Sequence, residues 1–458
     1  MTQESTQLAV IILAAGQGTR MRSAHPKVLH PLAGKPMLEH VVDAATQLNP
    51  ESVHVVYGHG GEQVQQQLQH LKVNWVLQAE QLGTGHAVEQ ALPALQSEEM
   101  VLVLYGDVPL IQMETVEQLL QQGSESGFSL LTVALENPTG YGRIVRDRQG
   151  NVARIVEQKD ASEDELQLNE VNTGIMALSA KKLQGWIDSL ENNNAQGEFY
   201  LTDIVEMAVA SGVEVSAVTA PTEAEVQGVN DRLQLAQLER IYQRQQAEAL
   251  MREGATLMDP ERFDLRGTLQ TGKDVTIDIN AIFEGEVVLG DGVKIGSNCH
   301  ISDAVIESGS EILPNSVIES AKVGPNCRVG PFARLRPGTE LTASNHIGNF
   351  VELKNSQVAE GSKINHLAYV GDTTVGARVN VGAGVITCNY DGANKHRTVI
   401  GDDAFIGSDC QLVAPVTVES GAVIGAGSTI VKTAPADQLT LSRSKQLTMK
   451  GWKRPVKQ

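Results

Sequence analysis

Aromatic residues and cysteines are scarce in this chain. Phe, Trp and Tyr make up only 4% of its 458 residues, although hydrophobic residues reach 41%. A core of this size must be built from aliphatic side chains, and the length allows two or three domains. The four cysteines form no C-x-x-C pair, and no histidine cluster has zinc-ligand spacing. We therefore expect free thiols, as in a reducing cytoplasm, and no zinc site.

Positive charge and long apolar runs are also lacking. The 36 Lys and Arg residues are outnumbered by 55 Asp and Glu residues, which gives a net charge of −19. Such a chain repels nucleic acids and anionic membranes, so neither is expected as a partner. No apolar stretch approaches membrane-spanning length, and Leu8–Ala15 lacks the basic flank of a signal peptide. We therefore expect no membrane insertion and a cytoplasmic location.

An aliphatic residue recurs about every six residues from Leu289 to roughly Ile430, usually followed by Gly or another small residue. Examples are Leu289-Gly290, Ile295-Gly296, Val329-Gly330, Ile347-Gly348, Val381-Gly382 and Ile424-Gly425. A period of six fits neither an amphipathic helix nor a hairpin meander. It fits short strands wound into coils, and each coil can bury its aliphatic residues only against neighbouring coils. The pattern therefore predicts a solenoid.

The first 230 residues alternate apolar runs with helical patterns. Strands are predicted at Val10–Leu13, Val53–Tyr57, Trp75–Leu77, Met100–Tyr105 and Leu130–Leu135, and helices at Pro36–Leu48, Gly61–Leu71, Gly85–Leu92 and Thr115–Gln122. This alternation predicts an α/β domain whose mostly parallel sheet is covered on both faces and binds ligands at the carboxyl ends of its strands. Residues 231–253 lack Gly and Pro and predict a helical linker. The predicted parts are thus residues 1–230, the linker 231–253, and the solenoid with a basic tail at 254–458.

A glycine-rich segment, Leu13-Ala14-Ala15-Gly16-Gln17-Gly18-Thr19-Arg20-Met21, follows the first predicted strand, and Lys27 comes shortly after it. Backbone N–H groups in such a turn can approach phosphate oxygens, and Arg20 and Lys27 add positive charge. The segment is no Walker A motif and no dinucleotide fingerprint, because the GK[ST] ending and the third glycine are absent. Asp107 ends a predicted strand, where its carboxylate could hold Mg²⁺ or cap a helix.

The string LAAGQGTRM, followed by Pro26-Lys27-Val28-Leu29, resembles the activation loop of sugar-nucleotide pyrophosphorylases. The resemblance implies that Arg20 and Lys27 act where UTP loses pyrophosphate, and that Asp107 and Asn230 hold Mg²⁺. The strings QAEQLGTGHA, YGDVPL, TGYGR, VEQKDA and NTG extend it. The implied contacts of UTP and UDP-N-acetylglucosamine are Leu13, Ala14, Ala15, Gly16, Lys27, Gln78, Gly83, Thr84, Tyr105, Gly106, Asp107, Gly142, Glu157, Asn172 and Asn230.

The hexads resemble the left-handed parallel β-helix of hexapeptide-repeat acyltransferases. Two departures from the repeat are informative. His366 stands inside one hexad, and residues Thr387–Val399 interrupt the rhythm between Ile386 and Ile400. A histidine on a coil face can be merely structural, whereas an insertion ejected from a coil is a candidate binding loop.

His366, Tyr369, Asn380, Asn389-Tyr390 and Lys395 resemble the acetyltransferase half of the bifunctional uridyltransferase–acetyltransferases that make UDP-N-acetylglucosamine. The resemblance implies that His366 is the general base as the amine of glucosamine 1-phosphate attacks acetyl-CoA. The implied contacts of glucosamine 1-phosphate are Arg336, Lys354, Tyr369 and Asn380. Those of acetyl-CoA are Ala383, Asn389, Tyr390, Ser408, Ala426 and Arg443. A homotrimer with acetyl-CoA sites between subunits is also implied, and so is a product used for peptidoglycan and lipopolysaccharide.

Alternatives to this two-step enzyme remain open. A monofunctional sugar-nucleotide pyrophosphorylase could carry the β-helix as a scaffold or regulatory domain, although it would need neither His366 nor the Asn389-Tyr390 insertion. A purely structural solenoid would leave LAAGQGTRM and YGDVPL unexplained. The basic tail could contact coenzyme phosphates or remain solvated.

Overall fold

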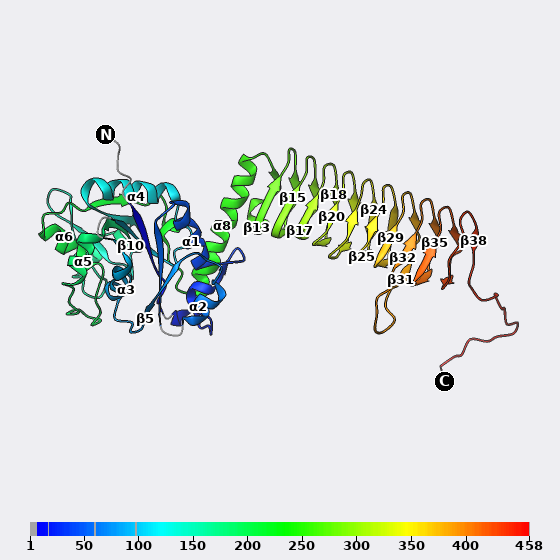
Figure 1. Ribbon diagram of the computed structural model, residues 1–458, viewed down its shortest axis with the longest axis horizontal. Coiled ribbons are helices and arrows are strands. Elements are labelled where there is room, and N and C mark those ends of the chain that lie inside the picture. Colours follow the sequence, from blue (N-terminus) through cyan, green and yellow to red (C-terminus); the bar gives the residue numbers. More distant parts are fainter. Residues whose placement is uncertain (1–6, 17, 59–60, 97–98, 458) are drawn as a thin grey trace. The chain divides into compact units, whose positions relative to one another are not determined.

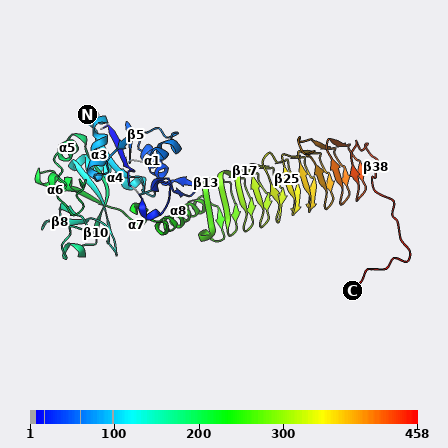
Figure 2. The same cartoon turned by 90° about the horizontal axis from the view of Figure 1, so that it is seen from below.

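The computed structural model describes residues 7–16, 18–58, 61–96 and 99–457 (Figures 1 and 2). It divides into two compact units, Met1–Tyr242 and Gln243–Gln458. The division falls inside helix α8 (Arg232–Arg252), in the segment where the sequence predicts a helix. Within the described ranges, no helix is long and apolar enough to cross a membrane.

A nine-stranded sheet forms the centre of the first unit, with its main path in the order β11-β7-β10-β6-β1-β4-β5. Strand β10 (Glu170–Ser179) runs antiparallel to β6 and β7, and the hairpin of β8 (Arg143–Arg146) and β9 (Val152–Val156) lies beside it. The parallel strands are β1 (Leu8–Leu13), β4 (Ser52–Gly58), β5 (Asn74–Gln78), β6 (Met100–Tyr105), β7 (Phe128–Ala134) and β11 (Ser216–Thr219). The predicted mostly parallel sheet is therefore confirmed.

Alternation along β1 explains why helices cover both faces of this sheet. Val10 and Ile12 pack in one apolar core, whereas Ile11 and Leu13 pack in another, because successive strand side chains point to opposite sides. The first core includes residues of α1 (Met37–Gln47) and α4 (Met113–Ser126). The second includes residues of α3 (Thr84–Ala91), α5 (Ala180–Ile187) and α6 (Asp203–Ala210).

Shorter elements complete the first unit. Helix α2 (Glu62–Gln67) ends earlier than predicted, and the next residue, Leu68, is buried in the first core. The small elements are β2 (Pro31–Leu32), β3 (Lys35–Pro36) and α7 (Glu223–Val226).

The second unit is a parallel β-helix with three faces, and its strands stack coil upon coil (Figure 1). The first face consists of β12 (Thr256–Leu257), β14 (Thr276–Ile277), β16 (Lys294–Ile295), β18 (Glu311–Ile312), β21 (Arg328–Val329), β24 (His346–Asn349), β27 (Lys363–His366), β30 (Asn380–Val381), β33 (Phe405–Ile406), β36 (Val423–Ile424) and β38 (Leu439–Thr440).

The other two faces belong to one sixteen-stranded sheet that begins with the long strands β13 (Phe263–Thr271), β15 (Ala281–Leu289) and β17 (His300–Ile306). From β17, the second face continues through β19 (Val317–Glu319), β22 (Arg334–Leu335), β25 (Glu352–Lys354), β28 (Tyr369–Gly371), β31 (Ile386–Cys388), β34 (Gln411–Val413) and β37 (Thr429–Ile430). The third continues through β20 (Lys322–Val323), β23 (Glu340–Leu341), β26 (Gln357–Val358), β29 (Thr373–Val375), β32 (Thr398–Ile400) and β35 (Val416–Val418).

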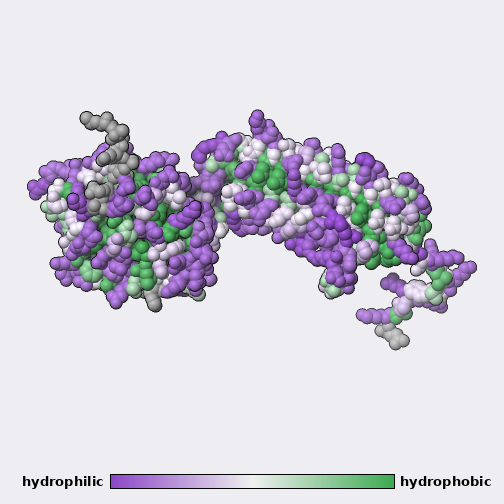
Figure 3. All heavy atoms as spheres, viewed as in Figure 1, coloured by the Kyte–Doolittle hydropathy of each residue, from purple (hydrophilic) through white to green (hydrophobic). Residues whose placement is uncertain are grey.

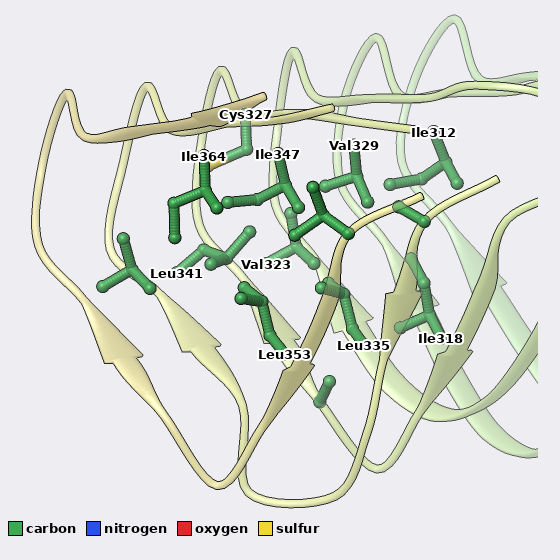
Figure 4. Close-up of a cluster of buried hydrophobic side chains, with 14 of the residues drawn as sticks. Ile312, Ile318, Val323, Cys327, Val329, Leu335, Leu341, Ile347, Leu353 and Ile364 are labelled. Atoms are coloured by element: carbon green, nitrogen blue, oxygen red, sulfur yellow. The ribbon is translucent and has the colours of Figure 1, made fainter. Parts of the chain in front are cut away.

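Aliphatic side chains from successive coils form a continuous column inside the β-helix (Figure 4). Ile312, Val329, Ile347 and Ile364 occupy paired positions on the first face, and each is at most 1% exposed. The six-residue period thus places one inward aliphatic residue on each face of a coil, and the predicted burial against neighbouring coils is confirmed. The free cysteines Cys299, Cys327 and Cys410 are buried in this unit, and Cys388 is half-buried.

Left-handed backbone conformations recur at the corners of the coils. At the corner that follows the first face, the residues on six successive coils have φ between 50° and 61°; they are Asn280, Asn298, Asn315, Phe332, Phe350 and Leu367. Asn tolerates this conformation, whereas large side chains rarely adopt it. The two Phe rings stack at 5.3 Å between centroids, and apolar side chains reach the surface of this unit (Figure 3).

Replacing Ile347 by alanine should destabilise the second unit, because the truncation leaves a cavity between stacked coils. Ile347 is fully buried, and such changes cost about 2–5 kcal/mol. Urea unfolding followed by circular dichroism would measure the loss. The matched control is Ile386→Ala, since Ile386 is 42% exposed and its truncation should cost about 0.5 kcal/mol or less. Equal losses would contradict the inward orientation of the hexad aliphatic residues.

Candidate active sites

Ten of the fifteen predicted nucleotide-binding residues line one cavity of about 540 Å³ in the first unit, whereas Gly106, Gly142, Glu157, Asn172 and Asn230 do not line it. Leu13 ends β1, Gln78 ends β5 and Tyr105 ends β6, so the cavity lies at the carboxyl ends of parallel strands, where such sheets bind ligands. The predicted residues that line it are Leu13, Ala14, Ala15, Gly16, Lys27, Gln78, Gly83, Thr84, Tyr105 and Asp107. Val28, Gln81, Ala87 and Glu198 line it as well and were not predicted.

The glycine-rich segment is shaped by a close approach to Lys27. Gly18 has a φ of 59°, and a Cβ atom added there would lie 2.6 Å from the Lys27 Cβ. Only glycine allows both the left-handed conformation and this proximity. Two short 3₁₀ turns, Thr19–Met21 and Lys27–Leu29, are anchored by buried apolar residues. Gln17 lies outside the described residues.

Arg20, Lys27, Asp107 and Asn230 come together at one end of the cavity. Lys27 Nζ forms an ion pair with Asp107 Oδ2 and lies 3.4 Å from Asn230 Oδ1. Arg20 Nη2 donates to the same Asn230 oxygen at 2.9 Å. Asn230 is held in turn by its backbone N–H, which donates to Gln234 Oε1 at 2.7 Å. The residues predicted for catalysis of uridylyl transfer, Arg20 and Lys27, therefore share one cluster with the predicted metal ligands, Asp107 and Asn230.

The chemistry of this cluster fits a magnesium ion. One carboxylate oxygen and one amide oxygen converge on a point that already holds a cation, the Lys27 ammonium. Mg²⁺ characteristically binds through one or two protein carboxylates together with substrate phosphates and water. In the described part of the chain, no group of three or more His, Cys, Asp and Glu residues could hold a metal ion. A metal ion held by Asp107 and Asn230 would therefore take most of its ligands from substrate and water.

Internal hydrogen bonds fix the far side of the cavity. The Gln78 side chain is 2% exposed, and its Nε2 donates to the Gly83 carbonyl oxygen at 3.1 Å. Thr84 Oγ1 accepts a hydrogen bond from the Leu201 backbone N–H at 3.1 Å. These contacts give Gln78 and Thr84 defined orientations, as recognition of a nucleobase edge requires.

Gly142, Glu157 and Asn172 form a neighbouring group. The Asn172 N–H donates to the Gly142 carbonyl oxygen at 2.9 Å, and a Cβ on Gly142 would lie 3.3 Å from Glu157 Oε1. Thr202, which was not predicted, donates its hydroxyl to Glu157 Oε1 at 3.0 Å. Burial raises the pKa of Glu157, and burial together with the nearby Glu157 raises the pKa of Asp203 to about 6. These carboxyl groups therefore retain protons more readily than solvated ones.

In the second unit, His366 ends β27 at the corner between the first and second faces. Its Nδ1 lies 2.7 Å from Asn349 Oδ1 on the preceding coil. An amide oxygen only accepts hydrogen bonds, so this contact places the proton on Nδ1 and leaves Nε2 as the basic atom. Asn349 was missed in the sequence, although its separation of 17 residues from His366 is the length of one coil.

Three residues predicted to contact acetyl-CoA lie at the same corner as His366, on the coils that follow it. The Gly384 N–H donates to the His366 carbonyl oxygen, and the Asp409 N–H donates to that of Ala383. On the next coil the Gly427 N–H donates to the Ser408 carbonyl oxygen. Arg443 Nη1 donates to the Ala426 carbonyl oxygen at 3.0 Å. The line of stacked positions is thus His366, Ala383, Ser408 and Ala426.

A basic cluster lies at the opposite edge of the second face. Arg336 follows β22, Lys354 ends β25, and Arg336 Nη1 pairs with Glu352 Oε1 at 2.8 Å. The neighbouring Lys395 ammonium, with a smaller effect of Arg336, lowers the pKa of Lys354. Such crowding of like charges favours the binding of an anion such as a sugar phosphate.

The predicted binding loop projects from the coils between β31 and β32 (Figure 1). Asn389 Nδ2 donates to Asp372 Oδ2 at 2.5 Å, whereas the Tyr390 side chain is 61% exposed. Asp372 was not predicted; it is buried and also accepts a hydrogen bond from Asn355.

A single chain does not bring all the predicted acetyl-transfer residues together. Tyr369 lies on the second face and Asn380 on the first, on either side of the His366 corner. Asn389 and Tyr390 lie at the other edge of the second face from Ala383 and Ser408. The candidate site for acetyl transfer is therefore an open corner rather than a closed cavity.

Comparisons with known proteins agree with both halves of this description. Residues 10–163 match the MobA-like NTP transferase domain, and residues 397–432 match the bacterial transferase hexapeptide of six repeats. The second match identifies the solenoid as the predicted left-handed β-helix.

Two curated relatives cover nearly the whole chain. The bifunctional protein GlmU of Azoarcus sp. (strain BH72) is 60% identical over 451 residues, 98% of this chain and 100% of the relative. The bifunctional protein GlmU of Marinobacter nauticus is 60% identical over 450 residues, 98% of this chain and 99% of the relative. With both transferase domains present in one chain, this protein belongs to the GlmU family of bifunctional enzymes, which join a uridyltransferase to an acetyltransferase.

Proposed function

We propose that the second unit acetylates glucosamine 1-phosphate with acetyl-CoA, and that the first unit joins the resulting N-acetylglucosamine 1-phosphate to UTP. The products of the second step are UDP-N-acetylglucosamine, a precursor for peptidoglycan and lipopolysaccharide, and pyrophosphate. One observation carries the proposal: Leu13, Gln78 and Asp107, which are far apart in the sequence, line the same cavity.

Uridylyl transfer requires two anions to meet. A phosphate oxygen of the sugar phosphate attacks the α-phosphorus of UTP in line, the bond to the β-phosphate oxygen breaks, and pyrophosphate leaves. Lys27 and Arg20 stabilise the negative charge on the leaving group, and the N–H groups of Ala15 and Gly16 hold the phosphates. The Ala14 N–H anchors the segment instead, by donating to the Val56 carbonyl oxygen at 2.8 Å. A Mg²⁺ ion held by Asp107 and Asn230 would add charge neutralisation when bound. Gly106 supports the metal ligand beside it, because its N–H donates to the Leu13 carbonyl oxygen at 2.9 Å.

Recognition of the two ends of the nucleotide sugar follows from the polar groups of the cavity. Gln78, Gly83 and Thr84 bind the uracil edge through amide and backbone groups. Gly142, Glu157 and Asn172 bind the ribose and the N-acetylated sugar.

Acetyl transfer is base-assisted. The amine nitrogen of glucosamine 1-phosphate attacks the thioester carbon, and His366 Nε2 accepts the amine proton. The carbon–sulfur bond then breaks, and the departing sulfur takes up a proton, so that coenzyme A leaves as the thiol. Arg336 and Lys354 bind the sugar phosphate, while Tyr369 and Asn380 contact the sugar. Ala383, Ser408, Ala426 and Arg443 bind acetyl-CoA along the His366 corner, with Asn389 and Tyr390 supplied from the projecting loop.

The assembly that best serves this site is a homotrimer with acetyl-CoA between subunits. The loop that carries Asn389 and Tyr390 lies across the second face from the His366 corner of its own chain, so a neighbouring copy can bring its loop against that corner. Three copies that each use this same interface with the next copy would close into a symmetric ring. The proposed location is the cytoplasm, a reducing compartment suited to four free cysteines.

Asp107→Ala and His366→Ala should separate the two activities. Asp107→Ala should abolish pyrophosphate release from UTP and N-acetylglucosamine 1-phosphate while thiol release from acetyl-CoA persists. His366→Ala should do the reverse, lowering thiol release by about 10²- to 10⁴-fold, the usual contribution of a general base. Wild type given acetyl-CoA and glucosamine 1-phosphate without UTP is the reference.

If the wild type releases no thiol but still produces pyrophosphate, the protein is a sugar-nucleotide pyrophosphorylase whose β-helix is only a scaffold. Loss of both activities in either folded variant would refute two independent sites.

Asn349→Ala should slow acetyl transfer by up to about tenfold, the kinetic equivalent of one lost hydrogen bond. Asn349 acts through His366, so kcat should fall and the pH profile of kcat should shift, with little change in KM for glucosamine 1-phosphate. Asn349→Asp keeps an acceptor facing Nδ1 and should retain more activity than Asn349→Ala. An unchanged pH profile in both variants would mean that Asn349 does not position the base.

A further inference from the structure

The Lys27 ammonium occupies the point toward which both proposed metal ligands are directed. Its Nζ pairs with Asp107 Oδ2 and lies 3.4 Å from Asn230 Oδ1. We propose that Lys27 is an internal counter-ion, which holds these two oxygens until a divalent cation displaces it. The inference rests on the proposed metal site and adds a second role to a residue that also binds the phosphates of UTP.

The environment of Lys27 distinguishes it from an ordinary surface ion pair. The side chains of Lys27 and Asp107 are only 11% and 17% exposed. The nearby pair of Lys35 and Asp43, with 2.6 Å between Nζ and Oδ2, is 41% and 47% exposed. A carboxylate removed from water needs a compensating positive charge, and Lys27 supplies it to Asp107.

A divalent cation and the ammonium cannot share the same two oxygens. Both are positively charged, and both seek the Asp107 carboxylate and the Asn230 amide oxygen. The backbone of Lys27 is fixed by the buried neighbours Val28 and Leu29, so the movable part is the side chain alone. Lysine suits such an exchange, because its charge sits at the end of a flexible stem.

Displacing the Lys27 ammonium from the Asp107 carboxylate costs less free energy when a triphosphate is present. Lys27 lines the cavity proposed for UTP, so its released ammonium can pair with phosphate oxygens there. Without nucleotide, the released ammonium would lose the Asp107 carboxylate and gain no phosphate oxygen in exchange. Divalent cation and nucleotide should therefore bind cooperatively, each removing the penalty that the other would meet alone.

The test is Mn²⁺ binding in the absence of nucleotide, followed by electron paramagnetic resonance of the free ion. Lys27→Met should bind Mn²⁺ at least about tenfold more tightly than wild type, a difference of about 1.4 kcal/mol. Asp107→Ala should lose the site. Two controls remove positive charge without freeing Asp107: Lys35→Met outside the cavity, and Arg20→Met, whose guanidinium contacts Asn230.

The outcomes separate the counter-ion from the metal site itself. Binding retained in Asp107→Ala would overturn both proposals. Loss in Asp107→Ala with unchanged or weaker binding in Lys27→Met would overturn the counter-ion alone. A gain in Lys27→Met no larger than that in Lys35→Met would also overturn it, because general charge removal would then suffice. An equal gain in Arg20→Met would overturn it too, because release of the Asn230 oxygen would then suffice.

A measurement on the wild type decides the matter if Lys27→Met does not fold. Reductive methylation of lysines can be followed by mass spectrometry, with Lys35 as the internal reference. Mn²⁺, at a concentration shown by electron paramagnetic resonance to be bound, should raise the labelling of Lys27 relative to Lys35. An unchanged ratio would overturn the proposal, because the ammonium would then not have left Asp107.

Discussion

The stacking of one coil directly on the next is the constraint on which the acetyl-transfer half depends. Each coil buries its aliphatic residues only against the coils above and below, so equivalent positions must coincide from coil to coil. The parallel register that pairs Ile347 with Ile364 also pairs Asn349 with His366. Packing of the interior therefore fixes the surface, and a functional side chain meets its partner one full coil earlier in the sequence.

A different constraint organises the first half. Parallel strands end at one edge of the sheet, and the segments that follow β1, β5 and β6 supply Ala14, Gly83 and Asp107 to the same cavity. At this edge the Lys27 ammonium and the Asp107 carboxylate neutralise one another, although the whole chain is strongly acidic.

Much of this could be predicted because periodicity and loop composition are local properties. The hexads indicated the solenoid, and the apolar runs indicated β1, β4, β5, β6 and β7. The antiparallel strand β10 and the β8–β9 hairpin were not predicted, although β10 contains the apolar run Ile175–Leu178. The contacts of Thr202 with Glu157 and of Asp372 with Asn389 join residues 45 and 17 positions apart, and no single stretch of sequence marks them. The left-handed conformations of Phe332 and Phe350 could not be predicted either, because the geometry of the coil sets the backbone conformation there.

The projecting loop illustrates how a rigid scaffold can carry a variable part. On the third face, Thr398 pairs with Thr373 as though the residues between Cys388 and Thr398 were absent, so the coil resumes in register. The entropic cost of closing a loop grows slowly, by about 0.6 kcal/mol for each doubling of length. Asn389 and Arg397, at the two ends of this segment, are hydrogen-bonded to the coils, whereas residues 390–395 between them are exposed. Exchange of this exposed part, by evolution or by design, would therefore leave the folding energy of the coils almost untouched.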